Sequence, residues 1–138
     1  MASYAEAASL GLRLNEAALR YYPRLQRVER YVRERALKDI HLKDAAGVAG
    51  LEAKYFSAFF HSKVGVRFRD WVRLLRVERA IQSMEIQFES IPRIAYTAGF
   101  RDVRSFERAF KQTVGVTPTS WRTSVQPGVH GLRGQRQR

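Results

Sequence analysis

The chain has 138 residues, of which 45% are hydrophobic, and its formal net charge is +12. This length suits one domain or two small lobes, and the apolar fraction supports a packed core, which excludes a wholly disordered chain. The excess of Lys and Arg favours an anionic partner: nucleic acid, an anionic membrane surface or an acidic protein. The chain has no cysteine, which excludes disulfides and thiolate metal sites and fits a reducing cytoplasm. No run of about 18 apolar residues is present, so we expect no span of a membrane.

The first 22 residues have a composition that favours helix. Ser3 and Glu6 have the spacing of a capping box, and alanine and leucine recur up to Leu19. We therefore expect an N-terminal helical extension over residues 1–22. Its role is open between three readings: packing on the rest of the chain, self-association, or the end of a preceding part of a longer protein.

A second helix is expected from Pro23 to about Leu37, because proline is tolerated in the first turn of a helix. Apolar residues, Leu37 included, recur along it with helical spacing and define a core face. Arginines are spread over its remaining faces, which predicts that most of them are solvated: Arg24, Arg27, Arg30, Arg33 and Arg35.

Two short helices joined by a tight turn are predicted at about residues 90–115. Ser90 can cap the first helix, and Gly99 lies where that helix must end, because glycine adopts the left-handed conformation without steric cost. Asp102 can cap the second helix, which has two phenylalanines four residues apart on its inner face. A helix–turn–helix that shows arginines on the outside of its second helix suits entry into the major groove of DNA.

The same pattern occurs twice in the chain. Apolar residues and glycines at about residues 41–65 recur at an offset of 49, which becomes 50 after one extra residue in the second turn. We therefore predict a first helix–turn–helix at about 41–65 and a second at about 90–115. The matched positions are Ala45-Ala46 with Ile94-Ala95, Gly50 with Gly99, Leu51 with Phe100, Phe56 with Phe106, Phe60 with Phe110, Val64-Gly65-Val66 with Val114-Gly115-Val116, and Trp71 with Trp121.

A longer helix is predicted between the two units, at about residues 68–84. It has two apolar stripes, and a helix with two buried stripes contacts two neighbours, so we expect it to bridge the units. A last short helix is expected near Trp121, followed over residues 125–138 by a disordered basic tail rich in Gly, Pro, Gln and Arg. The stripes are Phe68, Trp71, Val72 and Leu75, and Leu74, Val77, Ile81 and Met84.

Catalysis has little support in the sequence. His41, His61 and His130 are scattered over different predicted elements, no cysteine nucleophile exists, and no Gly-rich phosphate loop precedes a helix. We therefore predict no enzyme, no catalytic residue, no metal site and no cofactor. A basic protein-interaction module that reads no DNA sequence is the alternative that the charge leaves open.

One set of residues in the second unit matches a known signature: Ile94-Ala95, Gly99-Phe100, Asp102, Phe106, Arg108, Phe110-Lys111, Gly115 and Pro118. With these residues the chain resembles the AraC/XylS family of bacterial transcription regulators, over roughly residues 28–122. The resemblance implies an all-α domain of two helix–turn–helix lobes joined by a long linker helix. It implies that two recognition helices enter successive major grooves of double-stranded DNA, about 34 Å apart on one face. It also implies contact with RNA polymerase.

By position, the resemblance assigns base reading in the second lobe to Val103, Arg104 and Arg108, with Glu107 beside them. Arginine suits guanine because its planar fork matches O6 and N7 together, at about 1–3 kcal/mol of discrimination. Lys111 is a candidate for phosphate contact or a plain surface residue.

The first lobe departs from the family pattern. Ala58 stands where the family often has arginine, and Glu52 replaces the usual serine cap. Because alanine offers only a methyl group, for instance to thymine, we expect the two lobes to read DNA unequally. The candidates here are Ala53, Lys54, Ser57 and Ala58, with His61 for phosphate or as a plain surface residue.

Many family members carry an effector-binding, dimerising β-domain ahead of this unit, and the roughly 24 residues before it here are too few for one. The chain is therefore expected to be a stand-alone regulator or the DNA-binding piece of a longer, effector-responsive one. Met1 favours the former. The sequence leaves the oligomeric state open, and a regulator of this kind is expected in the cytoplasm.

Overall fold

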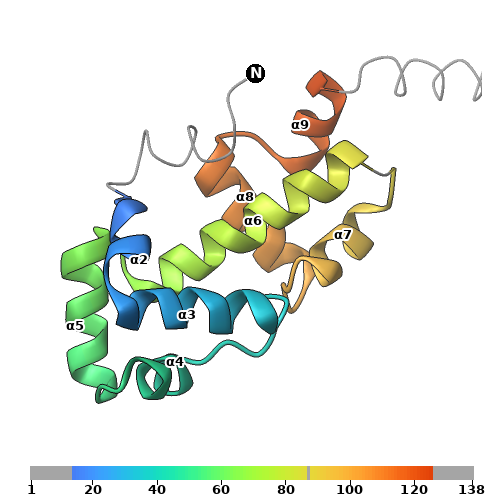
Figure 1. The fold of residues 1–138 in the computed structure, drawn as a ribbon. Coiled ribbons are helices and arrows are strands. Elements are labelled where there is room, and N and C mark those ends of the chain that lie inside the picture. The colour runs from blue at the N-terminus through green and yellow to red at the C-terminus, as the bar shows by residue number, and fades with distance from the viewer. Residues whose placement is uncertain (1–13, 87, 126–138) are drawn as a thin grey trace, which may run out of the picture.

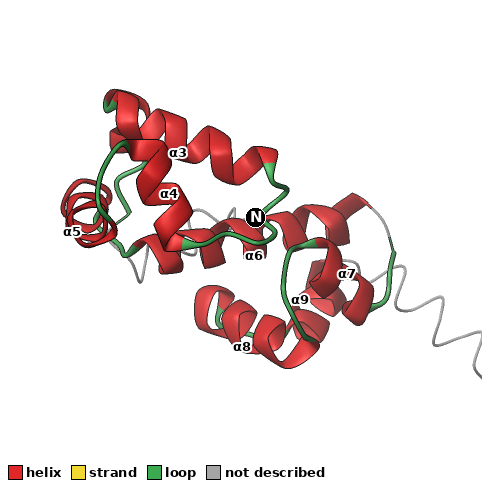
Figure 2. Ribbon diagram, turned by 90° about the horizontal axis from the view of Figure 1, so that it is seen from below, coloured by secondary structure: helices red, strands yellow, loops and turns green. Residues whose placement is uncertain are grey.

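The computed structural model describes residues 14–86 and 88–125. Within these ranges the structure is all helical, as Figures 1 and 2 show, which confirms the predicted fold of two helix–turn–helix lobes and a long linker helix. The helices are α2 (Ala17–Tyr21), α3 (Pro23–Glu34), α4 (Leu42–Ala49), α5 (Ala53–Val64), α6 (Phe68–Ile86), α7 (Ile91–Thr97), α8 (Val103–Val114) and α9 (Pro118–Val125).

The N-terminal helix α2 packs on the first lobe. The backbone N–H of Asn15 donates to the carbonyl of Val64 at 2.7 Å, and its side chain donates to the carbonyl of Lys63 at 3.3 Å. Leu19 is 4% exposed and belongs to the first core. The described part of the extension therefore packs against the C-terminal end of α5. Residues 1–13 of the predicted extension and the predicted tail beyond Val125 lie outside the described residues.

The two helix–turn–helix units repeat their hydrogen bonds. At the ends of α4 and α7, one N–H donates to the carbonyl three residues back and the next to the carbonyl five residues back. The donors are Gly50 and Leu51 in the first unit, Gly99 and Phe100 in the second, and the two glycines have φ of 74° and 101°. This is the closure that favours glycine at a helix end, as the sequence predicted.

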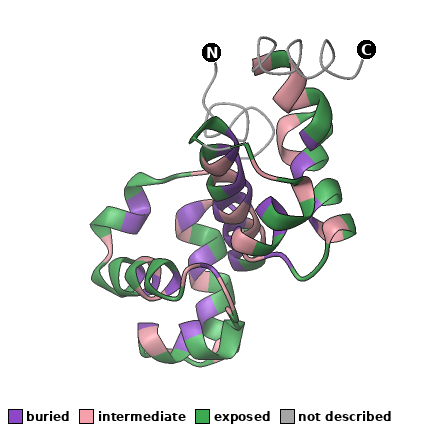
Figure 3. Ribbon diagram, turned by 90° about the vertical axis from the view of Figure 1, so that its right-hand side faces the viewer, coloured by how far each residue is buried: buried purple, intermediate pink, exposed green. Residues whose placement is uncertain are grey.

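Aromatic packing repeats as well. Trp71 lies on Phe60 with ring centroids 5.3 Å apart, and at the matched positions Trp121 lies on Phe110 at 6.2 Å. Figure 3 shows that buried residues follow the inner faces of the helices in both lobes. Each lobe therefore has its own hydrophobic core, built on the same positions of the repeat.

The linker helix α6 divides its buried residues along its length. Its N-terminal half belongs to the first core through Phe68, Trp71, Val72 and Leu75, and its C-terminal half to the second through Val77, Ala80, Ile81 and Met84. Leu74 belongs to the second predicted stripe, but it lines a hollow with Leu14 and Leu19 on the side of α2 and is not part of the second core with the other three residues of that stripe. Leu74 is buried, as the stripe predicted, and the N-terminal extension is an additional apolar neighbour of α6.

Helix α3 ends at Glu34, three residues before the predicted end at Leu37. Ala36 and Leu37 have φ of 54° and 63°, and their N–H groups donate to the carbonyls three and five residues back. Alanine therefore takes the position that glycine holds in α4 and α7, and no local residue signals the stop. Leu37 is still buried at 4% exposure, so its place in the core was predicted correctly.

Two arginines of α3 are not simply solvated. Arg24 donates to the carbonyl of Ala49 at 2.6 Å, and Arg27 donates to the carbonyl of Val48 at 3.3 Å. Both carbonyls lie at the C-terminal end of α4, where they lack helical partners and the helix dipole favours cations. These arginines therefore fix α3 across the end of α4.

Candidate nucleic-acid interface

Helix α8 begins at a side-chain cap and keeps one face free. Asp102 accepts a hydrogen bond from the backbone N–H of Ser105 at 2.7 Å. Phe106 and Phe110 are fully buried. Helical geometry then turns the positions predicted to meet DNA away from the core. Arg104, Glu107, Arg108 and Lys111 are exposed, and Val103 is half-buried.

The cap also sets the charge of Asp102. Hydrogen bonds from Ser105, first from its backbone N–H and then from its side chain, lower the pKa of this carboxyl, and nearby Arg101 and Arg104 add to the effect. Asp102 is therefore held as an anion at the N-terminal end of α8, where the helix dipole favours negative charge. The start of the second recognition helix is defined by this interaction.

Helix α5 has no such cap, because Glu52 makes no side-chain capping hydrogen bond. Its position is set instead by Phe56, Phe60 and Val64, which are fully buried. The opposite face carries the predicted positions of the first lobe. Lys54, Ser57, Ala58 and His61 are exposed, and Ala53 is half-buried.

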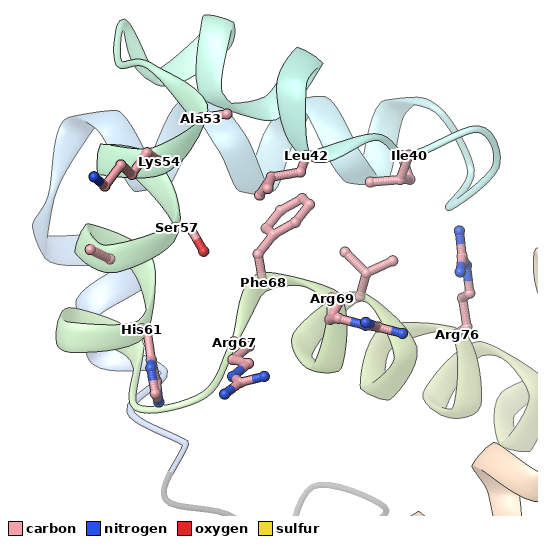
Figure 4. A pocket seen from close by; sticks show the side chains of 12 residues that line it. Ile40, Leu42, Ala53, Lys54, Ser57, His61, Arg67, Phe68, Arg69 and Arg76 are labelled. Atoms are coloured by element: carbon pink, nitrogen blue, oxygen red, sulfur yellow. The ribbon is translucent and has the colours of Figure 1, made fainter.

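All five of these first-lobe residues line one hollow of about 730 Å³. Figure 4 shows its other wall, in which Arg67 comes from the connection before α6 and Arg69 and Arg76 come from α6 itself, with Phe68 between the walls. The face of α5 predicted to meet DNA is therefore continuous with a cationic face of the linker helix.

A second hollow, of about 440 Å³, lies between α6 and α8. Of the predicted second-lobe residues only Arg108 lines it, while the other four lie elsewhere on the outer face of α8. Figure 2 shows α6 between α5 and α8. The remaining wall consists of Arg69, Arg73, Arg76, Phe100, Arg101, Ser105, Ala109 and Gln112.

Sequence reasoning missed the arginines of α6. Arg69, Arg73 and Arg76 are spaced i, i+4, i+7 and so form one stripe along the helix. This spacing is visible in the sequence, but the prediction for this helix concerned only its apolar residues. Arg69 and Arg76 line both hollows, so the stripe connects the outer face of α5 with Arg108 of α8.

The described part of the chain shows no group of three or more His, Asp or Glu residues that could hold a metal ion. Nor does it contain a helix of the length and apolarity needed to cross a membrane. The polar groups gathered at the interface are predominantly cationic. Such a surface suits an extended anion with regularly spaced charges.

Residues 45–124, more than half of the chain, match the family model described as a helix-turn-helix domain. The chain belongs to the AraC family of helix-turn-helix regulators. This confirms the resemblance found in the second unit, and family and fold are those of transcription regulators.

Relatives of this AraC-type domain are longer proteins. The regulatory protein PocR of Salmonella typhimurium is 30% identical over 107 residues, which make up 78% of this chain and 35% of PocR. The transcriptional activator NphR of a Rhodococcus species is 32% identical over 99 residues, or 71% of this chain and 29% of NphR. The chain thus spans about a third of the length of these relatives.

Solved structures share the AraC-type fold. The C-terminal domain of AraT, a response regulator from Geobacillus stearothermophilus, has a TM-score of 0.70 at 24% identity, covering 76% of this chain and 88% of that one. The DNA-binding domain of AdpA, crystallised with a target DNA, has a TM-score of 0.66 at 22% identity, covering 72% and 93%. At these identities the similarity establishes the fold.

Proposed function

We propose that this domain binds double-stranded DNA sequence-specifically and regulates transcription, with α5 and α8 in successive major grooves. One observation carries the proposal. The exposed face of α5 and, on α8, the exposed Arg108 adjoin the same arginine stripe of α6, so the cationic surface runs from one helix to the other. A helix–turn–helix reads DNA with its second helix, and here two such helices are joined by the linker helix α6.

In the second lobe, Val103, Arg104 and Arg108 are proposed to contact base edges. The two arginines are exposed on α8 with the spacing that places both on one face. Their guanidinium groups fit guanine O6 and N7, and Glu107 beside them can accept from cytosine N4. Lys111, one turn beyond Glu107, is proposed to contact phosphate.

In the first lobe, Lys54 and Ser57 are proposed to contact bases by hydrogen bonds. Ala53 and Ala58 offer only methyl groups, which suit the C5 methyl of thymine. His61 lies on the same wall of the hollow and is proposed to contact phosphate. We therefore propose that the second lobe contributes more hydrogen-bonded base recognition than the first.

The role of the whole protein is proposed from its relatives. Because this chain spans about a third of PocR and of NphR, a longer effector-responsive protein built on this domain is the alternative to a stand-alone regulator. RNA polymerase is the proposed partner at the promoter, and the cytoplasm is the proposed location.

Selection of bound duplexes from a random DNA pool tests the proposal. We expect one enriched sequence with two half-sites whose centres are about one helical turn, 10–10.5 base pairs, apart. Binding should keep a large preference for that site as salt is raised, because base contacts do not depend on counterion release. A pool that enriches nothing, with affinity for all sequences lost together at raised salt, would leave the basic protein-interaction module as the function.

A further inference from the structure

Among the described residues, the wall of the hollow between α6 and α8 contains arginines and no carboxylate. Four arginines that are not assigned to base reading line it: Arg69, Arg73, Arg76 and Arg101. We call these four residues the arginine cradle. Like charges in one hollow repel each other, so their collection favours an anionic occupant.

The guanidinium groups of the cradle are only partly used within the protein. Arg73 pairs with Asp70, and Arg76 donates from Nε to the carbonyl of Leu37 at 3.0 Å. Burial lowers the pKa of Arg76, yet an arginine keeps its charge at neutral pH. Arg69 and Arg101 are exposed and make no ion pair within residues 14–86 and 88–125. Among the described residues, no ion pair therefore engages their guanidinium groups.

The cradle has a defined position relative to the two recognition helices. Arg69 and Arg76 also line the hollow beside α5, so the cradle lies between the two recognition helices. When two helices occupy successive major grooves on one face of B-DNA, the element between them is a minor groove bordered by phosphates. An arginine fork matches two phosphate oxygens at once, which makes the cradle suited to that backbone.

We propose that the arginine cradle binds the phosphates that border the minor groove between the two half-sites. The inference rests on the proposed function and deepens it, since it assigns the linker helix a direct role in holding DNA. The cradle contacts no base, so it adds affinity and fixes the register of the two lobes without adding sequence preference.

The experiment uses Arg69→Gln and Arg101→Gln, with Arg79→Gln as the matched control. Arg79 is exposed on α6 and lines a hollow with Arg33 and Glu78 instead of the cradle. Binding to the selected duplex is measured over a range of salt concentrations. Each cradle variant should lower the slope of log affinity against log salt by about one, whereas the control should leave it unchanged.

A second arm replaces the phosphates between the half-sites with neutral methylphosphonates. The wild-type protein should lose affinity on this duplex, and the Arg69→Gln/Arg101→Gln double variant should lose little more. Two outcomes would contradict phosphate binding by the arginine cradle without affecting sequence-specific binding. One is that the losses caused by the double variant and by the neutral spacer add up, and the other is that the neutral spacer leaves the affinity of the wild-type protein unchanged. A loss in Arg69→Gln that changes with the A·T content of the spacer would also overturn it, because it would indicate minor-groove reading. If the wild-type protein selects no site, the proposed function itself fails.

Discussion

The carbonyl oxygen of Leu37 lies 2.6 Å from the point that a Cβ atom on Gly99 would occupy. The same oxygen accepts a hydrogen bond from Nε of Arg76 at 3.0 Å. The connection after α3 in the first lobe therefore contacts the turn of the second helix–turn–helix, and Arg76 of the linker helix is hydrogen-bonded to the same connection. Nearby, the ammonium of Lys38 lies 4.3 Å from the ring centroid of Tyr96, a cation–π contact between the lobes. The lobes are thus joined directly as well as through α6.

Gly99→Ala should destabilise the protein by about 2–5 kcal/mol, measured by denaturant unfolding. Gly99 has φ of 101°, which costs an L residue about 1–2 kcal/mol, and its Cβ would meet backbone that cannot rotate away. Gly115→Ala is the control, because Gly115 has φ of 97° but no atom of the described residues lies within 4 Å of the added Cβ. Equal losses in the two variants would show that the contact with Leu37 contributes nothing.

Ala36→Gly should stabilise the protein by about 0.5–1 kcal/mol. Relief of the left-handed conformation at Ala36, whose φ is 54°, exceeds the entropy that glycine adds to the unfolded chain. The measurement is again the free energy of unfolding. A destabilised variant would contradict the left-handed stop that ends α3 at Glu34.

Asp102→Asn should make stability less dependent on pH in the acid range. The folded protein lowers the pKa of Asp102, so the carboxylate stabilises the fold above the ordinary aspartate pKa of about 4, and this contribution is lost as pH falls through the lower folded value. Asparagine still caps the helix but carries no charge. The free energy of unfolding of the wild type should exceed that of the variant by less at pH 3 than at pH 6. An equal difference at the two pH values would contradict the lowered pKa of Asp102.

Arg108→Ala should relax base preference at one position of the second half-site, at a cost of about 1–3 kcal/mol on the selected duplex. Arg108 is exposed on α8, and its truncation leaves the core intact. The measurement compares affinities for duplexes with each base at that position. Equal weakening on selected and random DNA would assign Arg108 to phosphate.

One alanine inserted between Arg76 and Val77 should lower the affinity for the operator at least tenfold. The insertion turns the second lobe by about 100°, and all of its base contacts, each worth about 1–3 kcal/mol, are then lost together. The site is chosen because α6 belongs to the first core before Arg76 and to the second core after it. Circular dichroism checks that both lobes remain helical. A duplex with only the first half-site should bind the variant and the wild type equally, and unchanged affinity for the full operator would refute a fixed spacing of the lobes.

The elements of each lobe were predictable from sequence because their signals are local. A cap such as Asp102 acts over three residues, and phenylalanines four apart mark the inner face of α8, as they do in α5. Once the buried positions of a recognition helix are known, helical geometry determines which positions face outward. Hence the predicted residues of both helices are exposed or half-buried as expected, although their contacts with DNA stay predictions.

Only tertiary structure decided how the lobes meet. The end of α3 after Glu34 is not marked by a glycine in the sequence. It places the carbonyl of Leu37 next to Arg76 and Gly99, which are distant in sequence. The arginine stripe of α6 is visible as a spacing, but its place between α5 and α8 depends on which side of the helix each core covers. Helix caps and periodicity depend on neighbours within a few residues, whereas the approach of two lobes depends on the packing of side chains that the chain brings together only when it folds.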